Sequence, residues 1–309
     1  MGLLEFAGVY FAAPQVLVVL ISIYAAIGVL FLAFRANVEK PRARSKILVA
    51  IFALASSSWL FVGSGLAFCR AFEGLYYYHQ AMAVTMVLGA SLLATIVIGL
   101  PVSALMATKL PALVLRRLEK ELLKPGESSS GIMDAISQVA GMGSVALYQS
   151  PRRVPFAYSL GGGRDVIVIS RGLEESLDKD EMETVLMHEL AHLKNRDTQL
   201  NTLITVYRRV LFFDPLIRVL EGVIHREREF ACDDASARAT RKPLALASAL
   251  LKIHSGASGA KPAGAFLAGN IALRGNKTLR QRIDRLLRIA EELGSTPDGA
   301  RRSASGGAA

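Results

Sequence analysis

Cysteine is almost absent from this chain of 309 residues, which contains only Cys69 and Cys232. Two cysteines so far apart cannot build a disulfide framework, which excludes a small cross-linked secreted scaffold. The net charge is +10, yet no basic stripe interleaved with aromatic side chains is present, so no nucleic-acid partner is expected. Much of the basic charge flanks apolar segments instead, where it sets the orientation of a membrane protein.

Charged residues are also missing from three long apolar runs in the first third of the chain. Residues 8–34, 47–69 and 81–107 each exceed the roughly 20 residues that a membrane-spanning helix needs. No basic residue precedes the first run, and it is too long for a signal peptide. We therefore predict three transmembrane helices. Since the runs lack the internal charged groups of transporters, a transport function is disfavoured.

Basic residues are distributed unevenly over the segments that flank these runs. Residues 35–46 contain five and residues 109–124 contain five more, whereas Arg70 is the only one between the second and third runs. The positive-inside rule then places the N-terminus outside and everything after residue 108 in the cytoplasm. We expect a multi-pass protein of the cell membrane, with the lipid bilayer as one partner.

The chain after residue 108 is expected to have a different organisation. Residues 109–130 should form a juxtamembrane helix and a linker, residues 131–293 a cytoplasmic domain, and residues 294–309 a disordered tail. Within the domain, the apolar run from Val166 to Ile169 predicts a strand, and a shorter strand is expected near residues 144–149. The predicted fold class is mainly α, with three N-terminal membrane helices (together residues 1–108) followed by an α+β domain with a small sheet.

The sequence HELAH at residues 188–192 has the spacing of a metal-binding helix. Asp178 and Glu181 stand at the spacing of a capping box, which predicts a helix beginning near residue 179. Side chains four residues apart lie on one helix face, about 5–6 Å apart at Cβ, so both imidazoles can bind one zinc ion. Glu189 is then placed to act as general base on a water molecule. The pattern predicts a zinc peptidase with one Zn2+ per chain.

A third metal ligand has to come from another segment, and REREFACDD at residues 226–234 is the best candidate. Glu229 and Asp233 share one helical face, so one carboxylate can bind the metal while the other hydrogen-bonds a ligand histidine. Glu227 points about 160° away from Glu229 and is expected on a solvated face. The alternative for the whole run is an exposed charged helix. Cys232 could bind zinc, but a small buried residue is the favoured interpretation.

The two segments HELAHLKNRD and REREFACDD together carry a family resemblance. They resemble the HtpX-like membrane metallopeptidases and the related prenyl-protein proteases, and are equally similar to the peptidase domain of beta-lactam sensor-transducers of the BlaR/MecR type. The resemblance covers about residues 131–290 and includes PFAY at residues 155–158 and RIDRL at residues 282–286. It implies that the domain has a zincin-like fold.

The resemblance also implies roles for individual residues. It implies that His188, His192 and Glu229 bind the zinc ion. It further implies that Glu189 is the catalytic base and that Asp233 is a supporting carboxylate of the catalytic site.

Other residues are candidates for auxiliary roles. Asp197 matches an acidic position of the family, which implies a structural role or support of a metal ligand. His225 shares a helical face with Glu229 and is a candidate donor to the oxyanion, with a surface or interface histidine as the alternative. Tyr158 and Arg228 are further candidates for that donor.

A possible substrate strand precedes the glycine turn at residues 161–163. It contains Pro155, Phe156 and Tyr158. An edge strand there could pair with an extended substrate, because main-chain hydrogen bonds bind a peptide whatever its side chains are. The alternative is an ordinary surface loop.

Residues 203–224 depart from the HtpX-like pattern, in which further membrane segments typically lie between the two motifs. Here charged residues interrupt the segment and the apolar positions form only a stripe. We predict two helices broken near Pro215, packed on the domain or lying against the membrane surface. The segment from Phe213 to Leu216 is closer to the sensor type, although a beta-lactam-binding sensor domain would not fit into 309 residues.

The function that these features predict is a membrane-anchored zinc endopeptidase that hydrolyses proteins or peptides in membrane or cytoplasmic quality control. One alternative keeps the chemistry and changes the role, to a regulatory protease that cleaves a cytosolic repressor on a membrane signal. Another is a non-catalytic membrane scaffold that contains zinc. Structural zinc sites usually have four protein ligands, so a site with three ligands and a flanking glutamate favours catalysis. The sequence does not predict an oligomeric state.

Overall fold

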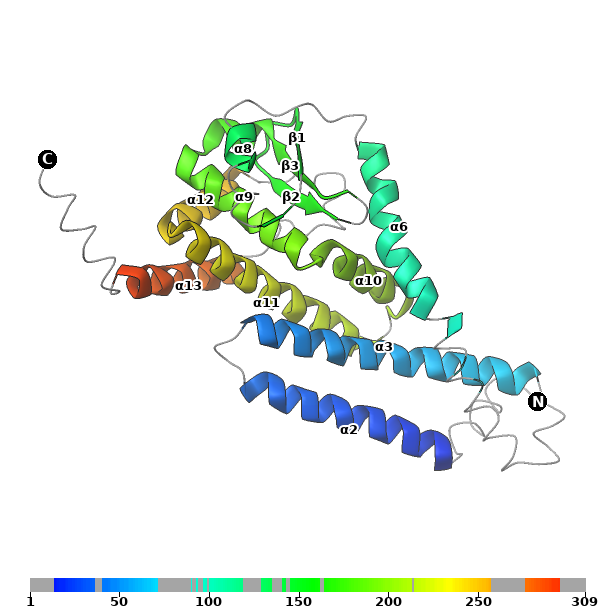
Figure 1. Ribbon diagram of the computed structural model, residues 1–309. Coiled ribbons are helices and arrows are strands. Elements are labelled where there is room, and N and C mark those ends of the chain that lie inside the picture. The colour runs from blue at the N-terminus through cyan, green and yellow to red at the C-terminus, as the bar shows by residue number, and fades with distance from the viewer. Residues whose placement is uncertain are drawn as a thin grey trace, which may run out of the picture. The chain divides into compact units, whose positions relative to one another are not determined.

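The computed structural model of the chain describes residues 14–36, 41–71, 90, 93, 97–98, 100–118, 129–134, 141–142, 145–161, 164–212, 214–256 and 276–294. The chain divides into two compact units. One comprises Met1–Met106 with Val206–Glu227, and the other Ala107–Thr205 with Arg228–Ala309. The elements of both units are labelled in Figure 1.

The first unit contains helices α2 (Pro14–Ala36) and α3 (Pro41–Ala71), which lie side by side (Figure 1). Within the described residues, Pro41–Val62 of α3 is the only helix long and apolar enough to cross a membrane, and Leu20–Ala36 of α2 is a shorter apolar helix. The predicted spans 8–34 and 47–69 overlap these two helices. Most of the predicted span 81–107 lies outside the described residues, so the set of three membrane helices stays a prediction.

Two polar contacts connect α3 with the later segment of the same unit. Nε1 of Trp59 donates a 2.7 Å hydrogen bond to Oδ2 of Asp214. Arg44 lies 3.3 Å from a carboxylate oxygen of Glu227, whose side chain is buried. The prediction that Glu227 lies on a solvated face is therefore wrong. Helical periodicity places it away from Glu229, but that side of the helix is covered by an arginine from α3.

The second unit contains a three-stranded sheet with the order β1-β3-β2. Strand β1 (Ala146–Ser150) runs parallel to β3 (Val166–Ser170), and β2 (Ala157–Leu160) runs antiparallel to β3. Strand β2 is therefore an edge strand within the described residues. The strand predicted from Val166 to Ile169 is confirmed as β3, and the one expected near residues 144–149 is confirmed as β1.

Helices make up most of the remaining described chain. They are α6 (Leu100–Leu118), α8 (Arg171–Ser176), α9 (Lys179–Lys194), α10 (Asp197–Val210), α11 (Pro215–Thr240), α12 (Pro243–Gly256) and α13 (Asn276–Gly294). The mainly helical character with a small sheet agrees with the predicted fold class. Helix α10 ends at Val210 and α11 begins at Pro215, so the predicted break near Pro215 is confirmed.

The two faces of the sheet contribute to separate apolar clusters, because side chains alternate along a strand. Ala157, Ile167 and Ile169 belong to a buried cluster that also contains residues of α9, α12 and α13. Phe156 and Tyr158 belong to a second buried cluster on the opposite face. Helix α9 thus packs against the face of the sheet that carries Ala157.

The capping box at the start of α9 is confirmed. Asp178 accepts a hydrogen bond from the main-chain N–H of Glu181, and Glu181 accepts one from the N–H of Asp178, both at 2.9 Å. The Glu181 carboxylate also accepts hydrogen bonds of 2.6 Å from Ser248 and Lys252 of α12. These contacts attach the start of α9 to a neighbouring helix, and so determine how the HELAH segment is placed.

Gly172 in α8 is required by a close approach of the main chain. Its N–H donates to the carbonyl oxygen of Arg152 at 3.1 Å, and a Cβ at this position would overlap the carbonyl oxygen of Arg153. We expect Gly172→Ala to lower the free energy of unfolding by about 1–3 kcal/mol, because the main chain would have to shift. Chemical denaturation of the detergent-purified protein measures this loss.

Gly222→Ala is the matched control, since nothing lies within 4 Å of a Cβ added at this position of α11. It should leave the stability unchanged or raise it by up to about 1 kcal/mol, through better helix propensity. Equal unfolding transitions for wild type and Gly172→Ala would contradict the prediction.

Candidate metal centre

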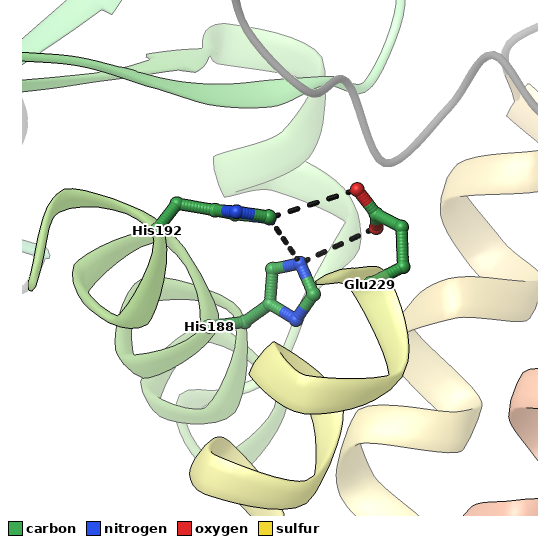
Figure 2. A group of neighbouring side chains, drawn as sticks. All are labelled: His188, His192 and Glu229. Carbon is green, nitrogen blue, oxygen red and sulfur yellow. Dashed lines mark hydrogen bonds and ion pairs between the residues drawn. The ribbon is translucent and has the colours of Figure 1, made fainter. Parts of the chain in front are cut away.

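Two imidazoles from α9 and one carboxylate from α11 face one another in the second unit (Figure 2). The Nε2 atoms of His188 and His192 are 3.1 Å apart. Oε2 of Glu229 lies 3.6 Å from Nε2 of His188, and its Oε1 lies 3.7 Å from Nε2 of His192. All three side chains are buried. The structure thus brings together the three residues that the sequence offers as metal ligands.

The donor set fits a zinc ion. Zinc binds histidine nitrogen at about 2.0–2.1 Å in a tetrahedral arrangement, which places two ligand nitrogens about 3.3 Å apart. The separation of 3.1 Å between the two Nε2 atoms is close to this value. One ligand atom from each of the three side chains lies within 4.8 Å of the others. Three protein ligands of this kind are typical of catalytic zinc sites.

A carboxylate contacts the other nitrogen of each imidazole. Nδ1 of His192 lies 2.6 Å from Oδ2 of Asp197, and Nδ1 of His188 lies 3.0 Å from Oδ1 of Asp233. Such contacts hold the ring so that Nε2 is directed to the metal. Burial lowers the pKa of His188, but the contacts with Asp233 and Glu229 outweigh it and raise that pKa to about 9. Metal binding would therefore displace a proton from His188.

These contacts place Asp197 and Asp233 in supporting positions. Each aspartate contacts Nδ1 of a histidine whose Nε2 faces Glu229. Asp233, which the sequence offers as a supporting carboxylate of the catalytic site, lies at Nδ1 of His188, where it can orient this ring.

Each supporting carboxylate is in turn paired with a buried arginine. Arg228 pairs with Asp197, and Arg282 donates two hydrogen bonds of 2.6 and 2.7 Å to Asp233. Burial raises the pKa of both aspartates, but the neighbouring arginine and the contact with the histidine together outweigh it in each case and hold the pKa below the usual range. Both aspartates therefore stay ionised and can accept the Nδ1 proton of a histidine.

Glu189 lies beside the ligand histidines in a different environment. Its side chain is fully buried, and among the described residues neither carboxylate oxygen has a hydrogen-bond partner of normal geometry. Burial raises the pKa of Glu189, and the charges of His192 and His188 and the hydroxyl of Ser159 offset this only in part. A buried carboxylate whose pKa is raised suits a group that accepts and releases a proton.

Ser159 is a residue that the sequence reasoning missed. It lies in the edge strand β2, and strand alternation places its side chain on the same face as Ala157, the face against α9. That alternation is visible in the sequence, but it identifies a neighbour of Glu189 only once the strand is known to pack on α9.

The predicted substrate residues Pro155, Phe156 and Tyr158 lie at the start of β2 or just before it, and all three are buried. Phe156 and Tyr158 stack with ring centroids 5.8 Å apart. Their side chains are therefore enclosed in the protein and do not form a surface for substrate. The predicted pairing of a substrate with the main chain depends instead on which main-chain groups of β2 point away from β3.

The outer edge of β2 presents main-chain groups of Ala157 and Ser159. The N–H of Ser170 in β3 donates to the carbonyl of Phe156 at 3.0 Å, so in this antiparallel pair alternate residues of β2 bond to β3 and those between them face outward. The hydroxyl of Thr198 in α10 reaches the Ser159 carbonyl at 3.4 Å. The N–H and C=O of Ala157 and the N–H of Ser159 thus point away from β3, and both residues are buried.

The three candidates for an oxyanion donor differ in their placement. Arg228 is engaged with Asp197 and donates a 2.9 Å hydrogen bond to Asn201. Tyr158 lies on the face of the sheet opposite α9, and burial, partly offset by Arg152, raises its pKa to about 12. His225 is half-buried in α11, and its role stays a prediction.

Cys232 lies beside the site without joining the three ligands. Its Sγ is 3.4 Å from Nδ1 of His192 and 3.8 Å from Oδ2 of Asp197, a group that could by spacing hold a metal ion. Burial and the charge of Asp197 raise the pKa of the Cys232 thiol well above its usual range. A protonated thiol is a poor ligand, so the placement favours a small buried residue.

The site is of the metallopeptidase type. It combines two histidines and a glutamate on one helix, a carboxylate from a second helix, and an adjacent edge strand. The chain belongs to the family described as BlaR1 peptidase M56, whose sequence profile matches residues 76–286. The resemblance to BlaR-type proteins is thereby confirmed, and relatives named as HtpX homologues confirm the resemblance to that type.

Several curated relatives carry the name Protease HtpX homolog. The chain is 30% identical over 158 residues to that of Gemmatimonas aurantiaca, covering 41% of this chain and 57% of the relative. It is 33% identical over 158 residues to that of Pyrococcus abyssi, covering 40% and 55%. For Thermococcus kodakarensis the identity is 29% over 215 residues, covering 53% and 73%. The chain thus spans little more than half the length of the first two relatives.

Among solved structures, the crystal structure of S. mikatae Ste24p is similar to the chain at 14% identity and a TM-score of 0.35. The alignment covers 92% of this chain and 98% of that one.

Replacement of Asp197 tests the support of His192. Asp197→Asn keeps the shape but removes the charge that faces Nδ1 of His192. We expect zinc affinity to fall about 10–100-fold, as is typical when the partner of a ligand histidine is lost. Competition with a chromophoric chelator measures the affinity, and circular dichroism verifies that the variant is folded.

Asp180→Asn is the control, because Asp180 is exposed on α9, the helix that carries His192, and pairs with Lys242. Its zinc affinity should equal that of the wild type. If Asp197→Asn bound zinc as tightly as Asp180→Asn, the supporting role would be refuted.

Proposed function

We propose that this chain is a membrane-anchored, zinc-dependent endopeptidase. The observation that carries the proposal is the buried group of His188, His192 and Glu229 beside Glu189, a buried carboxylate without a normal hydrogen-bond partner among the described residues. Membership of a peptidase family and relatives named as proteases support it.

The chemistry divides among the residues of the site. His188, His192 and Glu229 would hold one zinc ion, with Asp233 and Asp197 orienting the two imidazoles. When bound, the metal supplies a Lewis acid that acidifies water and polarises a carbonyl. Glu189 would take the proton of the attacking water and pass it to the leaving nitrogen. The raised pKa of Glu189 suits both transfers.

The edge of β2 supports an extended polypeptide as substrate. A peptide that adds as a further strand could pair with the main-chain groups of Ala157 and Ser159 that point away from β3, once the part of the protein that buries these two residues moves aside. Main-chain pairing depends little on side chains, so it suits a protease that acts on many unfolded segments. This favours a role in the quality control of membrane or cytoplasmic proteins.

A regulatory protease is the second candidate. The match to the family described as BlaR1 peptidase M56 favours it, because sensor-transducers of this type use the same chemistry in signalling. The two roles differ in breadth of substrate: quality control requires hydrolysis of many unfolded proteins, whereas a regulatory protease should leave them intact and cleave a particular repressor.

Replacement of Glu189 tests the catalytic proposal. In detergent-purified protein, Glu189→Gln should retain one zinc per chain, because the three proposed ligands are unchanged. Casein hydrolysis should fall by about 10²–10⁴-fold, the usual loss when a general base is removed. Zinc content and the rate of casein cleavage are measured on the same sample.

Glu183→Gln is the matched control on the same helix, where Glu183 pairs with Lys242 at 2.6 Å. It should cleave casein at the wild-type rate. A Glu189→Gln variant that cleaves as fast as this control would refute the role of Glu189 as general base. A wild-type protein that binds zinc but cleaves no casein would leave a zinc-containing scaffold as the better description of the chain.

We also propose that the N-terminus lies outside the cell and that residues 131–293 lie in the cytoplasm. The basic residues in segments 35–46 and 109–124 support this orientation. An epitope tag added after residue 309 should be digested by protease in inverted membrane vesicles and protected in right-side-out vesicles. The opposite pattern would reverse the orientation.

A further inference from the structure

Arg282 of α13 contacts two buried carboxylates of the proposed metal site and has no role in the chemistry described above. It lies in the segment at residues 282–286 that carries part of the family resemblance, and its side chain is only 2% exposed. Its Nε and Nη2 donate hydrogen bonds of 2.7 and 2.6 Å to the two oxygens of Asp233. Its Nη1 lies 3.0 Å from Oε2 of Glu229. One guanidinium therefore contacts both a proposed metal ligand and the carboxylate that orients His188.

The planar shape of the guanidinium makes this double contact possible. Glu229 and Asp233 are buried carboxylates on adjacent turns of α11, and two buried negative charges without a cation would be costly. The five N–H donors of arginine are arranged in a fixed fork, so one side chain can bind two carboxylates at once. Lysine supplies the charge but not the fork.

The contact also distinguishes the two oxygens of Glu229. Oε2 lies 3.0 Å from Nη1 of Arg282 and 3.6 Å from Nε2 of His188, whereas Oε1 lies 3.7 Å from Nε2 of His192 and is not the oxygen that Arg282 contacts. Both oxygens thus face an imidazole nitrogen, and the guanidinium competes with a metal cation for Oε2 only. A ligand that uses a single oxygen leaves more of the metal's coordination positions for water and substrate.

We propose that Arg282 is a positioning residue of the metal centre, which holds one oxygen of Glu229 so that this glutamate binds the metal through the other oxygen alone. This inference rests on the proposed zinc site. Arg228, the second buried arginine, pairs with Asp197 and so supports one histidine. Arg282 alone among the described arginines contacts a proposed metal ligand through an ion pair.

The chain contains a matched control for this arginine. Arg285 lies one turn further along α13 and donates hydrogen bonds of 2.6 and 2.7 Å to the two oxygens of Asp234 in α11. The Arg285 pair joins the same two helices with the same two-pronged geometry. It contacts neither Glu229 nor the two histidines through any ion pair of the described residues. Loss of helix docking alone should therefore affect both variants in the same direction, and more strongly for Arg282, because its pair with Asp233 is 2% and 0% exposed whereas the Arg285–Asp234 pair is 22% and 17% exposed. The Co2+ spectrum is the measurement that docking alone would leave unchanged.

The test compares Arg282→Met, Arg282→Lys and Arg285→Met in the purified full-length protein. Each is loaded with Zn2+ to measure affinity by chelator competition, and with Co2+ to record the visible spectrum, whose bands weaken as the coordination number rises. We expect Arg282→Met to bind zinc at least about 10-fold more weakly, as for other losses of support to a ligand. Its Co2+ bands should also weaken, because both oxygens of Glu229 can then bind.

Arg282→Lys retains the charge, and so keeps the site measurable if Arg282→Met fails to fold. It should show a smaller loss of affinity with the same direction of spectral change. Arg285→Met should match the wild type in both measurements. If the spectra of both Arg282 variants equalled that of the wild type, or if Arg285→Met changed as much as they do, the inference would be overturned. A wild-type protein that binds no zinc would instead refute the proposed function.

Discussion

The pairing of buried charges around two imidazoles is the constraint on which the rest of this site depends. His188 and His192 can direct Nε2 to a common point only if their Nδ1 atoms have partners, and those partners are Asp233 and Asp197. Buried carboxylates need cations, and Arg282 and Arg228 supply them. Helices α9, α10, α11 and α13 thus each contribute a member to one network of buried polar side chains.

Glu189 is the exception within this network. Every other buried acid at the site has a nearby arginine or imidazole partner, whereas the carboxylate of Glu189 has none of normal geometry among the described residues. A group that must change its protonation during a reaction is better left without a permanent ion-pair partner, which would hold it in one state. The environment of Glu189 therefore separates it from Glu229 and Asp233, although all three are buried acids.

The parts of the site that were predictable from the sequence are those set by local periodicity. The spacing of HELAH, the capping box at Asp178 and the shared helix face of Glu229 and Asp233 all depend on the geometry of one helix, and the structure shows these arrangements. The strands β1 and β3 were also recognisable, because short apolar runs between turns are typical of buried strands.

The rest depended on which elements pack together, which periodicity does not reveal. Glu227 was expected in solvent because the pattern shows only that it faces away from Glu229, not that Arg44 covers it. The role of Arg282 was not deduced, since the residue is far along the chain from Asp233 and a basic residue on a helix is usually exposed. The sequence predicted that Phe156 and Tyr158 lie in a strand that contacts substrate. The structure buries both side chains in an apolar cluster with other residues of the sheet.

The contact of Arg282 with Glu229 links metal binding to the docking of helix α13. Because α13 supplies a side chain to the metal centre, any cation that strengthens the arrangement of Glu229 and Asp233 also favours the docked position of α13 over an undocked one. By linkage, the binding free energy of the metal is shared with that docking equilibrium. The affinity of the proposed site for zinc would thus also report how firmly α13 is attached to the rest of its unit.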